Sequence, residues 1–286
     1  MTVTDDGVLL LMPAAAAHDA PGDVSLGTKL VTVYGRNGAR GHPTVYASYV
    51  LMDGLTGEPR AMLEGTFLTA LRTGATSALA ARYLARRDSA TVTCFGAGVQ
   101  ARFQLWCLAS VLPLERVVVL GRDPARARRF AEQAQRELGI EVAVGRGRGD
   151  VREADVVVCA TTSTEAIVSG VDLRPGTHVD AVGAFRATER EVDTEAVQRA
   201  RVVVDTYAGA LAEAGDILIP LGAGAIDRAH IAAELGEIVT GARPGRQDPE
   251  QITLFKSVGH AVEDLATARL AYNLARARGC GIEVTL

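Results

Sequence analysis

Short apolar segments separated by turn residues run through the first 65 residues of the chain. This pattern is typical of strands. It predicts strands at Val8–Met12, Leu26–Tyr34, Val45–Met52 and Arg60–Leu63, with turn signals at Asn37-Gly38 and Thr56-Gly57. Because consecutive strands joined by short connections pair antiparallel, we expect an antiparallel sheet with one apolar face left to be covered.

The periodicity changes after residue 65. A helical pattern from Thr66 to Arg87 comes first, and then short β-branched segments alternate with helices. The strands predicted there are Thr91–Phe95, Arg116–Leu120, Glu141–Val144, Asp155–Ala160, His178–Val182 and Arg201–Asp205. Alternation of this kind predicts a parallel sheet with helices on both faces.

After Leu221 the pattern is helical, interrupted by a polar loop at 241–249, and a last helix runs from about Gly259 to Arg278. We expect that helix to return and cover the free face of the antiparallel sheet. The predicted fold class is α/β: a Rossmann-type doubly wound parallel sheet plus a smaller α+β domain with an antiparallel sheet. The expected boundaries are 1–88, completed by 255–286, for the smaller domain and 89–254 for the Rossmann domain.

A glycine-rich turn follows the first strand of the parallel region. Gly96, Gly98 and Ala101 fit the pattern G-x-G-x-x-A, and Val99 and Gln100 open the helix that follows. Gly96 permits a tight turn and Gly98 a close approach of the backbone to a pyrophosphate, which the helix N-terminus then faces. The motif alone is often just a glycine turn, but its place between strand and helix favours dinucleotide binding.

The next strand ends in Gly121-Arg122-Asp123-Pro124. An acidic side chain at this tip accepts from the ribose 2′-hydroxyl of NAD, whereas an arginine suits the 2′-phosphate of NADP. Arg122 comes first, and arginines 126, 128 and 129 follow on the helix. We therefore favour NADP(H) over NAD(H). The alternative is that these arginines form a solvated helix face and that Asp123 binds the ribose.

Arg72 lies within an otherwise apolar helix, on a polar stripe with Thr69, Thr73 and Thr76. A buried charge needs a partner. One interpretation is an internal ion pair, for instance with Glu64. Because Arg72 comes shortly before the nucleotide strand, we favour a clamp on a substrate carboxylate or a cofactor phosphate.

Composition indicates a soluble cytoplasmic enzyme. The 286 residues are 48% hydrophobic with a net charge of −4, which gives no reason to invoke nucleic acid or a membrane, and neither a signal peptide nor a transmembrane run is present. The four cysteines and five histidines are scattered, so we expect reduced thiols and no metal site. All but two of the 30 basic residues are arginine. The exceptions, Lys29 and Lys256, point to positions where a compact ammonium is needed, the alternative being chance.

The helix LTALRTGATSALAARYLA and the GAGVQA turn resemble the ornithine cyclodeaminase and mu-crystallin family. The similarity continues through KLVTVYGRN, GHPTVYASYVLMDGLTGEP, VDAVGAF, ELGEIVTG and FKSVGHAVED and covers nearly the whole chain. The resemblance implies a nicotinamide-binding Rossmann domain joined to a smaller domain that binds substrate and dimerises. It also implies reactions that interconvert α-amino and α-imino acids.

Residue by residue, the resemblance places the family's carboxylate-binding lysine and arginine at Lys29 and Arg72. Cofactor contacts match Gly98, Gln100, Arg122 and Asp123 of the Rossmann domain, together with Thr44 and Thr73. Thr161 and Val182 end the fourth and fifth strands, and Ser257 and Val258 lie in the loop that closes over the nicotinamide. The mu-crystallin type also has arginine at the position of Arg122, which supports NADP(H).

Two departures from the family narrow the reaction. Ornithine cyclodeaminases hold the distal ammonium of the substrate with an acid where this chain has Leu10. They and the alanine dehydrogenase branch have an acid-base Asp where this chain has Phe185, which cannot transfer a proton. Reduction of a preformed ketimine needs neither acid. We therefore predict reduction of a small cyclic ketimine, Δ1-pyrroline-2-carboxylate or Δ1-piperideine-2-carboxylate, to L-proline or L-pipecolate.

Three other hypotheses stay open: an ornithine or lysine cyclodeaminase, an alanine dehydrogenase-type enzyme, and a non-catalytic NADP(H)-binding protein like mu-crystallin. The proton donor also stays open between a protonated substrate, water and Lys29. Relatives normally have, before the first strand, a helical segment with a further carboxylate-binding arginine, and here only six residues precede Gly7. We expect a late-assigned start, a shortened relative, or carboxylate binding by Lys29 and Arg72 alone.

Overall fold

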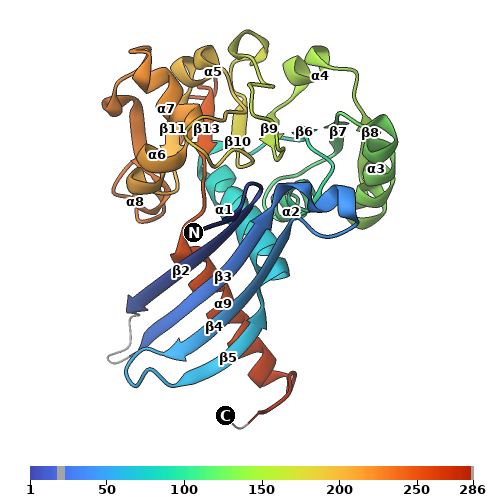
Figure 1. The fold of residues 1–286 in the computed structure, drawn as a ribbon. Helices are drawn as coiled ribbons and strands as arrows, with labels where there is room; N and C mark the ends of the chain where they lie inside the picture. The colour runs from blue at the N-terminus through green and yellow to red at the C-terminus, as the bar shows by residue number, and fades with distance from the viewer. Residues whose placement is uncertain (18–22, 285–286) are drawn as a thin grey trace. The chain divides into compact units, whose positions relative to one another are not determined.

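The computed structural model describes residues 1–17 and 23–284 (Figure 1). The chain divides into two compact units, Met1–Arg72 with His260–Leu286, and Thr73–Gly259. The sequence placed the boundaries at 88 and 255, whereas the structure separates the units after Arg72 and after Gly259. No helix in the described ranges is long and apolar enough to cross a membrane.

The first unit is an antiparallel sheet covered by one long helix. The sheet order is β1-β2-β3-β4-β5, and the strands are β1 (Thr2–Thr4), β2 (Gly7–Ala17), β3 (Val24–Tyr34), β4 (Val45–Asp53) and β5 (Pro59–Glu64). Helix α9 (Ala261–Ala277) packs on β2, β3 and β4. Tyr49, Leu51, Leu68, Leu265 and Ala268 form the core between them. The antiparallel sheet predicted from sequence, and its cover by the last helix, are both confirmed.

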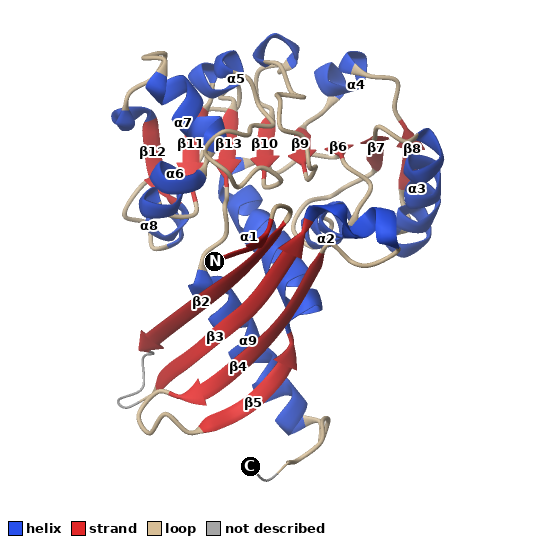
Figure 2. Ribbon diagram, in the orientation of Figure 1, coloured by secondary structure: helices blue, strands red, loops and turns tan. Residues whose placement is uncertain are grey.

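The second unit contains a parallel sheet of order β12-β11-β13-β10-β9-β6-β7-β8 (Figure 2). Its strands are β6 (Thr91–Phe95), β7 (Arg116–Leu120), β8 (Glu141–Val144), β9 (Val156–Cys159), β10 (His178–Ala181), β11 (Arg201–Val204), β12 (Ile231–Glu234) and β13 (Thr253–Lys256). All pairings between neighbouring strands of this sheet are parallel. The predicted Rossmann-type doubly wound fold is confirmed.

Helices cover both faces of this sheet. One face packs on α2 (Val99–Leu108), α3 (Pro124–Leu138), α8 (Leu235–Val239) and the part of α1 (Gly65–Leu84) that belongs to the second unit. The other packs on α4 (Arg148–Glu153), α5 (Thr194–Arg199), α6 (Tyr207–Glu213) and α7 (Gly215–Gly222). Short 3-10 turns occupy η1 (Gly35–Arg40), η2 (Gly170–Asp172) and η3 (Arg228–His230).

Three strands were not predicted from sequence: β1, β12 and β13. The omission of β13 matters most, because it lies between β10 and β11 in the middle of the sheet. Its four residues, Thr253–Lys256, are all buried, so they show no alternation of apolar and polar positions, and the strand ends in a lysine that resembles a surface residue. The helix α1 also ends earlier than predicted, at Leu84 in place of Arg87.

Candidate functional site

The turn between β6 and α2 has the geometry of a phosphate-binding loop. Gly96 has φ +114°, and a Cβ there would collide with the carbonyl oxygen of Ala160. Gly98 is the N-cap of α2 and has no side chain to occupy the free N–H groups of the first turn. Around Gly98, a Cβ would meet only the Arg126 guanidinium, 3.5 Å away. This open helix N-terminus fits a pyrophosphate.

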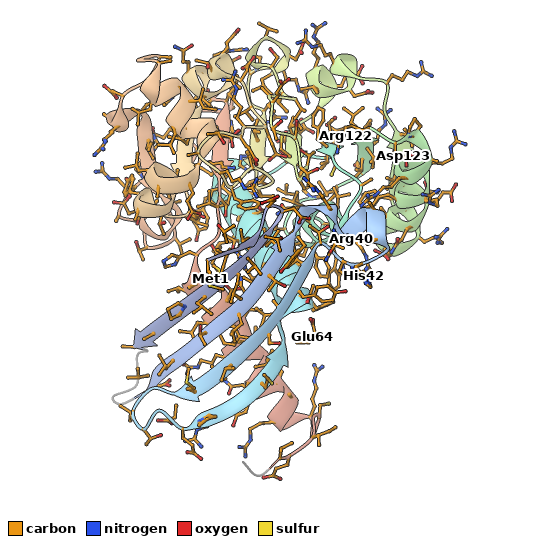
Figure 3. The ribbon with its side chains drawn as sticks, viewed as in Figure 1. Met1, Arg40, His42, Glu64, Arg122 and Asp123 are labelled. Carbon is orange, nitrogen blue, oxygen red and sulfur yellow. The ribbon has the colours of Figure 1, made fainter. Side chains whose placement is uncertain are left out.

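Arg122 and Asp123 lie beyond the end of β7, beside α3 (Figure 3). Asp123 caps α3, and its Oδ1 accepts from the backbone N–H groups of Ala125 (2.9 Å) and Arg126 (3.1 Å). These hydrogen bonds lower the pKa of its carboxyl. Arg122 donates to Thr162 Oγ1 (3.4 Å), and the Nε of Arg126 donates to the Ala97 carbonyl (3.0 Å). Two guanidinium groups therefore stand beside the glycine turn.

The ends of β9 and β10 are held together by one buried carboxylate, that of Glu191. Its Oε1 accepts from the N–H (2.8 Å) and hydroxyl (2.7 Å) of Thr161, and its Oε2 from the N–H groups of Gly183 (2.7 Å) and Ala184 (3.2 Å). Burial raises the pKa of Glu191. Thr161 and Val182, predicted as cofactor contacts, thus lie at the two strand ends that Glu191 joins. Glu191 itself was not predicted from sequence.

Lys256, the last residue of β13, contacts residues next to these strand ends. Its ammonium forms an ion pair with Asp216 Oδ2 (2.9 Å) and donates to the Ala184 carbonyl. Asp216 Oδ1 in turn accepts from the backbone N–H groups of Glu191 (2.7 Å) and Val192 (2.9 Å). Lys256, Asp216 and Glu191 are all fully buried. We call these three residues the Lys256 cluster.

The loop after β13 is fixed by a second carboxylate, Asp205, which follows β11. Asp205 Oδ2 accepts from the hydroxyl of Ser257 (2.9 Å) and from the N–H groups of Val258 (2.8 Å) and Gly259 (2.7 Å). Ser257 and Val258 were predicted as cofactor contacts. Since the Ser257 hydroxyl and the Val258 N–H already donate to Asp205, the carbonyl groups and side-chain surface of this loop are what it can offer a ligand.

The first unit brings Lys29 and Arg72 together on two carboxylates at the start of α9. Lys29 Nζ donates to both oxygens of Asp264 (2.8 Å each), and Arg72 Nε donates to Asp264 Oδ1 (3.1 Å). Arg72 Nη1 donates to Glu263 Oε2 (2.6 Å). Lys29, Arg72 and Asp264 are buried, and 15% of the Glu263 side chain is exposed. We call these four residues the Lys29 cluster.

Arg72 therefore forms internal ion pairs, but with Asp264 and Glu263 and not with Glu64, the partner suggested from sequence. Glu64 lies at the end of β5, where α1 begins (Figure 3), and its carboxylate caps that helix by accepting from the N–H groups of Thr66 and Phe67 (2.7 Å each). Asp264 and Glu263 were missed because they are 192 and 191 residues from Arg72. The signal that could have found them is the acidic pair closing the motif FKSVGHAVED.

Burial sets the charge behaviour of the Lys29 cluster. Burial and the neighbouring Arg72 lower the pKa of Lys29 to about 8, and Asp264 and Glu263 offset only part of this. Burial also opposes the charge on Arg72, but Asp264 and Glu263 outweigh it and raise its pKa. At neutral pH the cluster holds two cations against two carboxylates. An ammonium with a pKa of about 8 can both bind an anion and release a proton.

Four further positions singled out from the sequence are Thr44, Thr73, Leu10 and Phe185. Thr44 precedes β4, and its carbonyl accepts from the Tyr34 N–H (2.8 Å). The Thr73 carbonyl accepts from the Gln104 side chain (3.4 Å). Leu10 on β2 and Phe185 after β10 are 39% and 36% exposed. No carboxylate stands at either position, so Leu10 cannot hold a substrate ammonium and Phe185 cannot transfer a proton.

Comparisons with known proteins show what the chain is similar to. The family model described as ornithine cyclodeaminase/mu-crystallin matches residues 1–279. A Δ1-pyrroline-2-carboxylate reductase of Bacillus cereus is 38% identical over 282 residues, 98% of this chain and 85% of the relative. The ketimine reductase mu-crystallin of Rattus norvegicus is 38% identical over 268 residues, 93% of this chain and 80% of the relative.

Among solved structures, the Δ1-pyrroline-2-carboxylate reductase of Thermococcus litoralis in complex with NADH and L-proline is similar to this chain. The TM-score is 0.89 and the sequence identity 41%, over 98% of this chain and 90% of the other. The likeness therefore extends over both compact units and does not rest on the Rossmann domain alone.

Proposed function

From its membership of the ornithine cyclodeaminase/mu-crystallin family, we propose that this chain is an NADPH-dependent imino-acid reductase. Its substrate is a small cyclic ketimine, Δ1-pyrroline-2-carboxylate or Δ1-piperideine-2-carboxylate, and its product is L-proline or L-pipecolate. The observation that carries the proposal is a pair of cations, Lys29 and Arg72, on shared buried carboxylates in a chain with Phe185 at the acid-base position. Relatives similar over nearly the whole chain are Δ1-pyrroline-2-carboxylate reductases.

The chemistry is a two-electron reduction of a C=N bond. When bound, the nicotinamide supplies a hydride to the imine carbon; the π electrons of the bond move to nitrogen, which takes up a proton. Lys29 and Arg72 hold the carboxylate next to the imine, so the carbon is presented in one orientation. Lys29 is also the group of this cluster that can donate the proton, since its pKa is lowered to about 8.

Preference for NADPH rests on this chain's own residues, because the Thermococcus litoralis relative is described with NADH. Oδ1 of Asp123 caps α3, while Arg122 and Arg126 stand beside the glycine turn. We expect Arg122→Ala to lower the ratio of kcat/KM for NADPH over NADH about tenfold, since a charge-assisted contact to phosphate is lost. A wild-type ratio of one or less would refute the preference.

We also propose a homodimer formed through the uncovered face of the antiparallel sheet. Leu11 lies opposite Leu30, and Met62 opposite Val50, on the side facing away from α9. Leu11 is 64% and Met62 75% exposed, and an exposed apolar sheet face is typical of an interaction surface. Light scattering should give twice the chain mass for the wild type and the monomer mass for Met62→Glu.

For the compartment, a cytoplasmic location is proposed from the cysteines. All four are free thiols. Burial raises the pKa of Cys94 to about 12 and also raises that of Cys159, so these two are unreactive and suited to packing. Mass spectrometry of the protein from its native cells should find all four reduced.

A panel of imino acids tests the activity. Purified protein is mixed with NADPH and either cyclic ketimine, or pyruvate with ammonia or methylamine, and NADPH oxidation is followed by absorbance. We expect turnover with the cyclic ketimines. Turnover of ornithine or lysine to a cyclic product without any ketimine reduction would replace the proposal by a cyclodeaminase. Tight NADPH binding without turnover of any compound would identify a binding protein.

A further inference from the structure

The loop Ser257–Gly259 depends on one side chain outside it. Asp205 follows β11, which pairs with β13 in parallel register, so Val204 lies opposite Lys256 and Asp205 comes level with the start of the loop. A single oxygen, Oδ2, accepts from three consecutive residues of the loop. The other oxygen, Oδ1, accepts from the N–H of Thr206 (2.7 Å). Asp205 is buried, with 8% of the residue exposed.

The arrangement defines one loop conformation. Gly259 has φ +90°, a conformation that other residues rarely adopt. The Ser257 hydroxyl also accepts from the Gly259 N–H (3.1 Å), so the loop closes on itself around the carboxylate. On its other side the loop meets α6: a Cβ on Gly209 would lie 3.0 Å from Val258 Cγ2. Val258 is therefore held between Asp205 and the first turn of α6.

The loop lies on the side of the glycine turn where the nicotinamide half of a dinucleotide would bind. In a doubly wound sheet the ligand lies across the carboxyl ends of the strands, with its pyrophosphate at the glycine turn. Here that turn follows β6, and the adenosine side extends toward Arg122 after β7. The loop after β13 lies on the opposite side of β6, beyond β9 and β10. A nicotinamide ring directed away from Arg122 would reach this loop.

We propose that Asp205 is a positioning residue for nicotinamide binding: its carboxylate holds the Ser257–Gly259 loop in the conformation that receives the ring. Asp205 itself contacts the loop, and not the cofactor. This inference rests on the proposed use of a nicotinamide cofactor, but it does not depend on which imino acid is reduced. The residue to compare is Asp155, another carboxylate that accepts several hydrogen bonds from the backbone and a hydroxyl, and that also pairs with Arg86 and Arg174.

Asp155 offers a matched control at the opposite edge of the same sheet. It immediately precedes β9 and accepts from the N–H groups of Ala90 (2.9 Å) and Thr91 (3.0 Å) and from the Thr91 hydroxyl (2.9 Å). Since the strands are parallel, this is the amino-terminal edge, away from the ligand. Asp155→Asn should destabilise the fold without discriminating between nucleotides.

The test measures binding of NADPH and of 2′-phospho-ADP-ribose, which lacks only the nicotinamide, by calorimetry. In Asp205→Asn we expect the Kd of NADPH to rise about tenfold and that of 2′-phospho-ADP-ribose to change by less than about twofold, since hydrogen bonds to a charged acceptor are lost only at the nicotinamide end. Ser257→Ala, which removes one of the three donors, should act in the same direction to a smaller extent. Asp155→Asn should leave both Kd values unchanged.

The outcomes separate this inference from the proposed function. Equal weakening of both nucleotides in Asp205→Asn, or no weakening of either, overturns the role of Asp205 while leaving the reductase proposal intact. A wild-type protein that binds neither NADPH nor NADH overturns the proposed cofactor, and with it the reductase. NADH and ADP-ribose replace the first pair of probes if the wild type prefers NADH, and the same comparison applies.

Discussion

The only two lysines of the chain are both buried on an aspartate, yet their surroundings differ. In the Lys256 cluster one cation faces two carboxylates, and backbone N–H groups of Thr161, Gly183, Glu191 and Val192 satisfy most of the oxygens. In the Lys29 cluster, two cations face two carboxylates, and Asp264 accepts from the side chains of Lys29 and Arg72. The first arrangement holds loops in place. The second presents two cations, and an incoming carboxylate can share them with Asp264 and Glu263.

The contrast shows that a buried ion pair does not by itself indicate a site or a scaffold. What decides is which groups satisfy the carboxylates. Hydrogen bonds to backbone N–H groups tie a carboxylate to the fold, so its cation serves to neutralise it. A carboxylate bonded to cationic side chains orients those side chains for a ligand. We therefore expect substitutions in the two clusters to act on different quantities: activity at Lys29 and stability at Lys256.

The largest effect is expected for Lys29→Met. The variant loses both a carboxylate-binding cation and the proposed proton donor, and kcat/KM for the cyclic ketimine should fall by about a thousandfold. Lys29→Arg should also lose most activity, because a guanidinium stays charged and cannot donate the proton proposed for Lys29. Steady-state kinetics measures both. Activity within about tenfold of wild type in Lys29→Met would place the site elsewhere.

Lys256→Met should have its effect on folding. It leaves Asp216 and Glu191 buried together without a cation, and breaking a buried pair by removing one partner costs about 3–5 kcal/mol. Denaturant unfolding should show this loss, whereas Lys29→Met should lose only about 1–2 kcal/mol because Arg72 still pairs with Asp264. If Lys29→Met proved the more destabilising of the two, the division into site and scaffold would be wrong.

The next largest difference between the two clusters is expected in the pH dependence of activity. With the pKa of Lys29 lowered to about 8, kcat/KM should fall as the pH rises above 8, because the ammonium is lost. In Asp264→Asn two influences that raise this pKa, the charge and the hydrogen bond of Asp264, are removed while Arg72 remains. The fall should therefore begin at lower pH. Asp216→Asn, in the other cluster, should leave the position of this limb unchanged even if it destabilises the protein.

Sequence alone predicted the elements whose signals are local. The strands β2 to β5 of the antiparallel sheet, the glycine turn and α1 follow from periodicity and from residue types a few positions apart. The strand β13 could not be recognised because Thr253–Lys256 is buried on both faces and too short to show a period. Its place between β10 and β11 is set by pairing with residues distant in sequence.

The candidate site divides in the same way. Lys29 and Arg72 were found because a lysine is rare in this chain and a charge is rare on an apolar helix. The carboxylates that hold the functional groups, Glu191, Asp205 and Asp264, were not, since acidic residues are common and their role depends on contacts up to 235 positions away. The residues proposed to act directly were predictable from their type, and the residues that position them required the structure.

The smallest effect is expected for Glu263→Gln, which tests whether the Lys29 cluster is open to exchange. Glu263 accepts a hydrogen bond from Arg72 Nη1 and is the cluster's partly exposed member. It therefore competes with a substrate carboxylate for this donor. Removing its charge should lower KM about two- to threefold, in the range of a partly exposed ion pair, and leave kcat nearly unchanged. Initial rates over a range of ketimine concentrations measure both parameters. A higher KM would mean that Glu263 orients Arg72 as Asp264 does, and the Lys29 cluster would then be as fixed as the Lys256 cluster.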